Sequence, residues 1–161
     1  MKNTIEDKSK LVNSVFSEVY DKYDLMNDVM SLGIHRIWKD KFIDWMNPSR
    51  NSSLIDVASG TGDIAKLFSL RNKNFSTVTC VEPNDGMLQK GKSNLIKFKN
   101  IKWIKSKAEI LPIADNMYDF YSISYGIRNV SDINKTLKEA YRVLKPGGRF
   151  MCLEFSKIDN E

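Results

Sequence analysis

A short apolar run that leads directly into two closely spaced glycines constrains the fold of this chain more than any other feature. Leu54–Ala58 is apolar apart from one aspartate, Ser59–Asp63 holds the two glycines, and a helical pattern follows with Ile64, Leu67 and Phe68 on one face. Short apolar runs bounded by turn residues are typical of buried strands. A strand, a glycine turn and a helix in this order predict the start of a unit in which a helix connects two parallel strands.

The alternation of strand-like and helical segments continues along the chain. Further strands are predicted at Thr77–Val81, Ile101–Ile104, Phe120–Ser124 and Arg149–Phe155. One helix is expected near Asp85 and another after the Ser131-Asp132 cap, with Pro146-Gly147-Gly148 as its stop signal. The predicted buried face of this last helix consists of Ile133, Leu137, Ala140, Tyr141 and Leu144. The pattern predicts an α/β fold with a mostly parallel sheet and flanking helices.

The first fifty residues have a helical rather than a strand-like pattern. Apolar side chains recur at helical spacing in two groups, which are Leu11, Val12, Val15, Phe16 and Val19, and then Ile34, Ile37, Trp38, Phe42, Trp45 and Met46. Asn47–Ser52 breaks the pattern and is expected to be a loop. A chain of 161 residues suits one ordinary domain. We therefore predict one structural domain, in which residues 1–50 form a helical N-terminal extension to a core at residues 51–161.

Composition excludes several classes of function. The single histidine, His35, excludes multi-histidine metal sites, and no metal ligand is predicted. Cys80 and Cys152 are too few for a disulfide framework and are expected to be buried in strands. No apolar run approaches the ~20 residues of a membrane-spanning helix. Glu6 and Asp7 argue against a secretory signal, so a reducing, cytoplasmic location is expected.

The net charge of +5 permits three interpretations of the basic segment 90–107, in which lysines are interleaved with Phe98 and Trp103. A nucleic-acid surface has this kind of composition. A solvent-exposed helix face followed by a strand explains the same residues, and we favour it, so no nucleic-acid partner is predicted. Mild attraction to anionic lipid head groups is also compatible with the charge.

The glycine turn and an acid further along the chain predict a nucleoside-cofactor site. Ligands of open parallel sheets bind beyond the carboxyl ends of the strands, where Gly60 and Gly62 let the backbone approach a ligand closely. The N–H groups of the following helix favour a carboxylate or phosphate there. About 20 residues on, Glu82 stands at the end of the next predicted strand, directly after Val81, and can accept hydrogen bonds from ribose hydroxyls. The third glycine of the dinucleotide pattern is missing, although the small Ala65 leaves NAD open.

Resemblance to a known family favours S-adenosyl-L-methionine (SAM) over NAD. Asp56–Asp63 resembles the first motif of class I SAM-dependent methyltransferases. Three further segments, Tyr23–Lys39, Ile123–Val130 and Arg142–Lys157, resemble the UbiE-type ubiquinone/menaquinone biosynthesis C-methyltransferases in one register. The resemblance implies a Rossmann-like class I methyltransferase fold, truncated after its fifth strand so that an apolar edge is left open. It also implies that the N-terminal extension covers the active site.

The resemblance further implies contacts with four parts of SAM. Residues at or just after the carboxyl ends of four different strands would meet the methionine end, the ribose, the adenine and the transferable methyl group. In that order they are Gly60, Thr61, Gly62 and Asp63, then Glu82, then Lys107 and Ala108, and last Ser124. Glu82 stands where the family usually has aspartate, and Ser59 where it commonly has glycine.

The implied reaction is methylation of a ring carbon in a polyprenylated benzoquinol or naphthoquinol, with the ubiquinone and menaquinone branches both left open. Arg128 is the candidate for stabilising the phenolate that makes the ring nucleophilic. His35 is a second catalytic candidate, as a base, because histidine exchanges protons near neutral pH. The lipophilic substrate implies peripheral contact with the inner membrane face. A homo-oligomer or a biosynthetic complex is left open.

Three other functions are compatible with the sequence. One is a truncated, catalytically inactive fragment that binds SAM without turnover. Another is a SAM methyltransferase that acts on an oxygen or nitrogen of a different small molecule, which the segments Tyr23–Lys39 and Ile123–Val130 argue against. The last is an NAD-dependent reductase.

Overall fold

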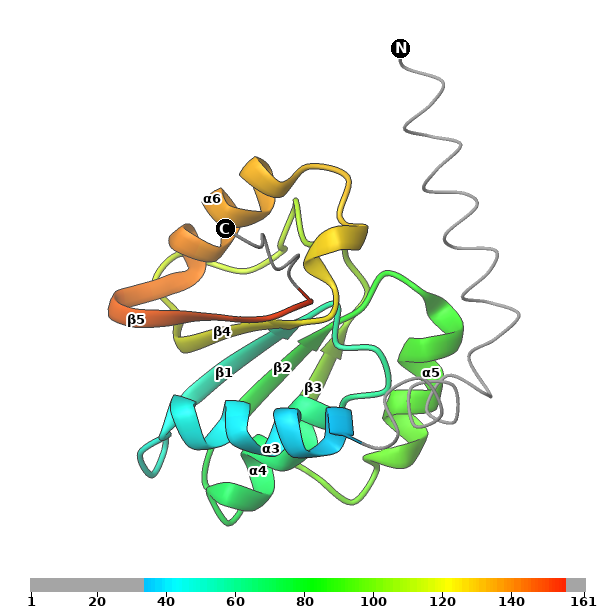
Figure 1. The fold of residues 1–161 in the computed structure, drawn as a ribbon, viewed down its shortest axis with the longest axis vertical. Coiled ribbons are helices and arrows are strands. Elements are labelled where there is room, and N and C mark those ends of the chain that lie inside the picture. The colour runs from blue at the N-terminus through cyan, green and yellow to red at the C-terminus, as the bar shows by residue number, and fades with distance from the viewer. Residues whose placement is uncertain (1–33, 156–161) are drawn as a thin grey trace, which may run out of the picture.

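The computed structural model describes residues 34–155, in which five parallel strands form one sheet (Figure 1). The strands are β1 (Ser53–Val57), β2 (Thr77–Val81), β3 (Ile101–Ile104), β4 (Tyr118–Ser124) and β5 (Leu144–Leu153), in the spatial order β3-β2-β1-β4-β5. The helices are α3 (Ile34–Met46), α4 (Asp63–Arg71), α5 (Asp85–Asn94) and α6 (Ile133–Val143), with a short 3-10 helix η2 (Ile127–Asn129). The predicted α/β fold is confirmed, whereas the helix expected at Leu11–Val19 lies outside the described residues.

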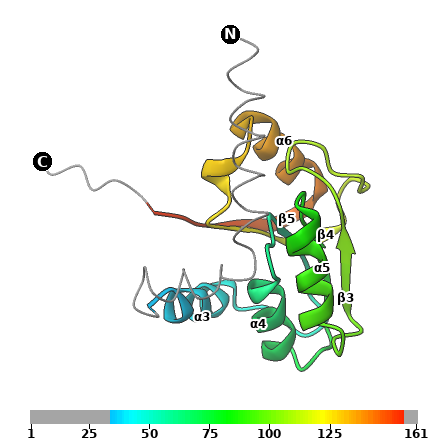
Figure 2. The same ribbon diagram turned by 90° about the vertical axis from the view of Figure 1, so that its right-hand side faces the viewer.

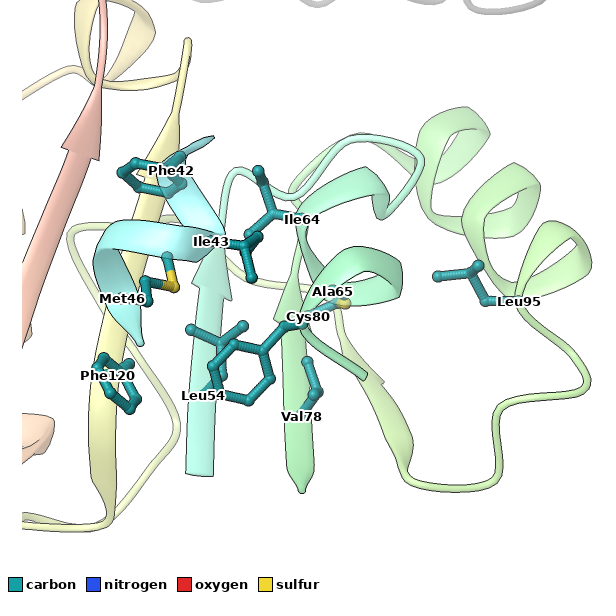
Figure 3. Close-up of a cluster of buried hydrophobic side chains, with 11 residues drawn as sticks. Phe42, Ile43, Met46, Leu54, Ile64, Ala65, Val78, Cys80, Leu95 and Phe120 are labelled. Atoms are coloured by element: carbon teal, nitrogen blue, oxygen red, sulfur yellow. The ribbon is translucent and has the colours of Figure 1, made fainter. Parts of the chain in front are cut away.

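The sheet has a hydrophobic cluster on each face, because successive side chains of a strand point to opposite faces. On one face, α3 and α4 pack over Leu54 of β1 and Val78 of β2 (Figure 3). On the other face, α6 packs over Ile55 and Val57 of β1. Figure 2 shows α3 and α4 on one side of β5 and α6 on the other. Every residue of β1 is buried, so the loop that follows this strand starts from a firmly held position.

The helix face that α6 buries differs from the predicted one. Its buried residues are Thr136, Ala140 and Val143. The prediction is wrong for three large side chains, which are exposed: Ile133, Leu137 and Tyr141. Smaller side chains at the contact allow the helix to approach the sheet closely, which periodicity alone does not reveal.

α3 is a helix as predicted, but it too exposes much of its apolar surface. Its buried residues are His35, Lys39, Phe42, Ile43 and Met46. Four of the apolar residues that predicted this helix are exposed instead: Ile34, Ile37, Trp38 and Trp45. Both α3 and α6 therefore carry an apolar stripe on the side that faces away from the described core.

β5 begins earlier than predicted. α6 ends at Val143 rather than at Pro146, and the chain passes directly into β5 at Leu144. Pro146–Gly148 is accommodated within the strand because the register with β4 shifts between Tyr118 and Phe120.

The two cysteines have different surroundings. Cys80 in β2 is buried, as predicted, whereas Cys152 in β5 is exposed. Within residues 34–155, β5 pairs only with β4 and is the outermost strand on its side of the sheet. The prediction of a buried Cys152 is wrong because an edge strand receives less cover from its neighbours.

The basic segment 90–107 contains a close contact that fixes α5 on the sheet. Gly91 of α5 faces the ring of Trp103 in β3, and a Cβ atom at position 91 would lie 2.1 Å from Cη2 of that ring. Phe98 and Trp103 pack against the first cluster rather than forming an exposed aromatic surface. The segment is therefore a helix followed by a strand, as we favoured from the sequence.

We expect Gly91→Ala to destabilise the fold, although alanine is the better helix former by about 1 kcal/mol. The ring of Trp103 has to move to admit the methyl group, and overpacking of this kind costs about 1–3 kcal/mol. Urea unfolding followed by circular dichroism measures the change. Lys92→Ala, on the exposed side of the same helix, is the control and should stay within about 0.5 kcal/mol of the wild type. A Gly91→Ala protein more stable than the wild type would contradict this packing.

Candidate functional site

The loop between β1 and α4 adopts a backbone conformation that requires its glycines. Gly60 and Gly62 have φ values of +56° and +88°, in the left-handed region that other residues rarely adopt. A Cβ atom on Gly62 would also lie 2.7 Å from Cδ1 of Leu95. The N–H of Gly62 donates to the carbonyl oxygen of Ser59 at 2.9 Å and closes the turn. The loop is thus a tight turn at the carboxyl end of β1.

Glu82, directly after β2, holds this loop in place. Its carboxylate oxygens accept hydrogen bonds from the N–H of Gly60 at 2.8 Å and from the N–H of Asn84 at 2.9 Å. Burial raises the pKa of the Glu82 carboxyl above its ordinary value, and the two backbone N–H groups oppose that rise. Glu82 therefore supports the glycine loop, a role that sequence reasoning missed because the contact joins two separate strand ends.

An open pocket lies at the carboxyl ends of β1 and β4. These strands are neighbours at the point where the strand order reverses, which is the usual ligand position in such sheets. The pocket is lined from the glycine loop, the end of β4 and α3, by Lys39, Asp56, Ala58, Ser59, Gly60, Thr61, Asp63, Ile64, Ser124 and Tyr125. Of the predicted cofactor residues, the structure brings together Gly60, Thr61, Asp63 and Ser124.

Asp56 contributes a buried carboxyl group to this pocket. Its Oδ1 accepts a hydrogen bond from Oγ of Ser122 at 2.6 Å, while its Oδ2 has no hydrogen-bond partner within residues 34–155. Burial raises the pKa of Asp56 to about 7, against the opposing effects of the Ser122 hydrogen bond and the charge of Lys39. Oγ of Ser124 is a second buried polar atom without a partner in this part of the chain. A polar ligand in the pocket would satisfy both atoms, whose burial is otherwise unfavourable.

Lys39 adds a positive charge to the same pocket. Its Nζ donates to Oδ2 of Asp63, the first residue of α4, at 2.7 Å, and its side chain is only 11% exposed. The contact ties α3 to α4 and places an ammonium group close to two carboxyl groups. Sequence reasoning missed Lys39, although a signal was present. Its spacing from Phe42 and Ile43 puts it on the buried face of α3.

The other predicted cofactor residues are not part of the pocket lining. Within the loop, Gly62 faces Leu95, and Glu82 supports the loop from its position just after β2. After β3, Lys107 is exposed and Ala108 is buried in the second cluster. The structure thus places these residues after the strands expected for them.

The two candidate catalytic residues also lie outside the lining. His35 is buried at the start of α3. Arg128, in η2, forms an ion pair with Glu154 and lies 5.7 Å from the ring centroid of Phe155. Phe155 stacks on Tyr125, which lines the pocket, with ring centroids 5.0 Å apart. Arg128 therefore lies next to the ring pair that borders the pocket, where burial raises the pKa of the Tyr125 phenol and the charge of Arg128 opposes that rise.

Solved structures of methyltransferases have a similar fold. A SAM-dependent methyltransferase from Aquifex aeolicus is similar with a TM-score of 0.69 at 22% identity, over 76% of this chain and 66% of that one. A putative methyltransferase from Bacillus halodurans has the same TM-score of 0.69 and identity of 22%, over 76% of this chain and 52% of that one. At these identities the likeness concerns the fold. The chain has the Rossmann-like fold of the class I methyltransferases, as the resemblance implied.

Within that class, residues 2–161 match the ubiE/COQ5 methyltransferase family, and the chain belongs to this family. The ubiquinone/menaquinone biosynthesis C-methyltransferase UbiE of Rickettsia bellii is 55% identical over an alignment 159 residues long, and the match covers 94% of this chain and 63% of the relative. The protein of the same name from Rickettsia prowazekii is 54% identical over 158 residues, with the same coverage of 94% and 63%. The chain thus spans about 63% of the length of these relatives.

Proposed function

We propose that this chain is the SAM-binding part of a C-methyltransferase that acts on a ring carbon of a polyprenylated benzoquinol or naphthoquinol in ubiquinone or menaquinone biosynthesis. Its family and the names of its relatives support the reaction class. The observation that carries the cofactor assignment is the pocket beside the glycine loop, where Oδ2 of Asp56 and Oγ of Ser124 are buried without partners among the described residues.

The residues around the pocket fit SAM. Asp56 would accept a hydrogen bond from the ammonium group of its methionine end, and Lys39 would hold the carboxylate together with the N-terminus of α4. Each carboxylate oxygen of Glu82 retains a lone pair for a ribose hydroxyl. Lys107 and Ala108 are the candidates for the adenine. When bound, SAM supplies an electrophilic methyl group on a positively charged sulfur.

The protein's own part in the reaction is to orient the quinol, exclude water and favour its phenolate form. We assign the last role to Arg128, because a guanidinium stays charged and carries several N–H donors. Its ion pair with Glu154 leaves donors for a phenolate oxygen. His35 is the alternative, as a proton acceptor on α3.

Lys39→Met is expected to weaken SAM binding at least about tenfold without unfolding the chain. Methionine keeps most of the apolar stem, whereas a hydrogen bond to a charged group, worth about 1.5–3 kcal/mol, is lost. Asp63 is 45% exposed, so water can replace its lost partner. Calorimetric titration with SAM measures the affinity. Lys41→Met, on the exposed side of the same helix, is the matched control. Equal affinities for the two variants would rule out Lys39 as a cofactor contact.

Methyl transfer from labelled SAM to a demethylated quinol tests the activity itself. Label on a ring carbon supports the proposed reaction, and label on oxygen or nitrogen points to a SAM methyltransferase of another kind. SAM binding without transfer points to the second candidate, a SAM-binding fragment without turnover. That candidate is kept as the alternative because the chain spans about 63% of the length of its relatives.

The partners follow from the proposed substrate. A polyprenylated quinol resides in the bilayer, so we propose peripheral contact with the cytoplasmic membrane face, and self-association or a biosynthetic complex is compatible with this. Within residues 34–155, no helix combines the length and the hydrophobicity needed to cross a bilayer.

A further inference from the structure

α3 carries an apolar stripe on the side that faces away from the sheet. The stripe consists of four side chains that are between 40% and 73% exposed, which are Ile34, Ile37, Trp38 and Trp45. At helical geometry these positions fall within one arc of about 100°. The arc lies opposite Lys39 and Ile43, which are buried. A surface helix normally buries an arc of this width.

The charges of α3 leave this stripe basic. Lys41 lies in its middle, and its side chain is 66% exposed. Both acidic residues of the helix, Asp40 and Asp44, lie on the flank toward α4, where they pair with Arg71. Lys41 also approaches Asp44 at 3.6 Å, but exposed pairs of this kind are weak. The arc that the four stripe residues span thus includes one ammonium group, that of Lys41, and no carboxylate.

A row of aromatic rings connects the stripe with the pocket. Trp38 meets Phe155 edge to face, with ring centroids 5.8 Å apart. Phe155 stacks on Tyr125, which lines the pocket. Trp38 and Phe155 are both exposed, so the row runs from the surface of the molecule to the candidate site.

We propose that the outer face of α3 lies on an anionic lipid bilayer, and that the aromatic row gives the lipophilic substrate access from the bilayer to the pocket. Tryptophan favours the boundary between acyl chains and head groups, and a helix with an apolar stripe and basic residues binds in that plane. Lys41 contacts the anionic head groups. This inference rests on the proposed function, because a lipophilic substrate is what requires the pocket to open toward a membrane.

α6 offers a matched comparison on the opposite side of the sheet (Figure 2). Its exposed stripe consists of Ile133, Leu137 and Tyr141, and it contains no tryptophan. The pocket is lined from α3, the glycine loop and the end of β4. Both helices therefore carry an exposed apolar stripe. Only the stripe of α3 combines tryptophan, a central lysine and a ring contact toward the pocket.

Co-sedimentation with vesicles tests this surface. The vesicles consist of phosphatidylcholine alone or mixed with phosphatidylglycerol. We expect the double variant Ile37→Gln/Trp45→Gln to bind the anionic vesicles at least about tenfold more weakly than the wild type. The double variant Leu137→Gln/Tyr141→Gln should bind as the wild type does, and the wild type should prefer the anionic vesicles. The four substituted residues lie outside the pocket lining, so SAM binding measured by calorimetry should be unchanged in both variants.

Tryptophan fluorescence separates a lipid surface from other occupants. Quenching of the wild-type emission by bromine-labelled lipid should fall when Trp45 is replaced by phenylalanine. Equal vesicle binding by the two double variants, or no vesicle binding by a wild type that binds SAM, would overturn the docking surface and leave the proposed function intact. A change of oligomeric state in the α3 variant without a change in vesicle binding would assign the stripe to a second copy of the chain and also overturn it.

Discussion

Asp56→Asn is expected to weaken SAM binding about a hundredfold and, above neutral pH, to stabilise the protein without cofactor. Removing one partner of a buried charge pair costs about 2–5 kcal/mol of binding free energy, and Asp56 is the carboxyl group that we assign to the ammonium of SAM. In the free protein the same carboxylate is unfavourable, because burial raises the pKa of Asp56 from 3.8 to about 7. Asparagine carries no charge, and its Oδ1 can still accept the hydrogen bond from Ser122.

The pH dependence follows from the same raised pKa. Between pH 3.8 and about 7, folded Asp56 retains a proton that the unfolded chain has released, so its contribution to stability falls as pH rises through this range. Above that range the contribution stays at its lowest value. The stability of the wild type should thus fall relative to Asp56→Asn as pH rises, while wild-type SAM affinity should increase through the same pKa. Thermal unfolding and calorimetric titration at a series of pH values measure the two effects.

Asp119→Asn is a matched control, because the pKa of Asp119 is shifted in the opposite direction to that of Asp56. Asp119 lies in β4, where its carboxylate accepts from Nζ of Lys145 at 2.8 Å and from Oγ of Ser53 at 2.7 Å. Burial acts to raise the pKa of Asp119, but the hydrogen bonds from Lys145 and Ser53 together hold it below its ordinary value. This variant should lose stability above the ordinary pKa and keep its SAM affinity. If Asp56→Asn likewise loses stability and keeps its SAM affinity, the assignment of Asp56 to the ammonium group of SAM is wrong.

Glu82→Ala is expected to abolish measurable SAM binding and to destabilise the fold. The substitution removes the acceptor of two backbone N–H groups, those of Gly60 and Asn84. A buried N–H without a partner costs about 1–3 kcal/mol, so the free energy of unfolding should fall clearly. The glycine loop loses its support, and the cofactor loses the residue proposed for its ribose. Urea unfolding measures the stability, and calorimetric titration measures the binding.

Glu139→Ala is the control for Glu82, because Glu139 also accepts a hydrogen bond from a backbone N–H, that of Leu111 at 2.7 Å. It should lose stability but keep its SAM affinity, since Glu139 lies on α6. Glu82→Gln should bind SAM weakly, because its amide nitrogen would face an N–H donor instead of accepting from it. Normal SAM binding by folded Glu82→Ala would exclude Glu82 from the site.

The strands of the sheet could be predicted because their signals are local. Each apolar run is bounded by turn residues, and the predicted limits of Thr77–Val81 and Ile101–Ile104 agree with β2 and β3. The buried faces of the helices were harder to predict, because α3 and α6 each have more apolar residues than the core receives. For α6 the packing favours Thr136 and Ala140 over the larger Leu137. Which side chains of a helix are buried depends on the distance between the helix and the sheet, and no local sequence pattern shows that distance.

Of the candidate site, the glycine loop could be predicted from the sequence, whereas the side-chain contacts could not. Gly60 and Gly62 stand out because glycine is needed for their positive φ. Lys39 enters the pocket from α3 through its ion pair with Asp63, across 24 positions of sequence, and no local pattern shows that contact. Asp56 was visible as an acid inside an apolar run, but its raised pKa depends on burial that only the folded sheet provides.

The most direct test of the account is a calorimetric titration of the purified chain with SAM, repeated with NADH and with Gly60→Val. Valine is strained at a φ of +56°, yet the nearest atom to its Cβ would be Sδ of Met87 at 3.7 Å, so the variant should fold. We expect one saturable SAM site in the wild type, no comparable binding of NADH, and loss of SAM binding in Gly60→Val. A folded wild-type chain that does not bind SAM, or that binds NADH in its place, would contradict this expectation.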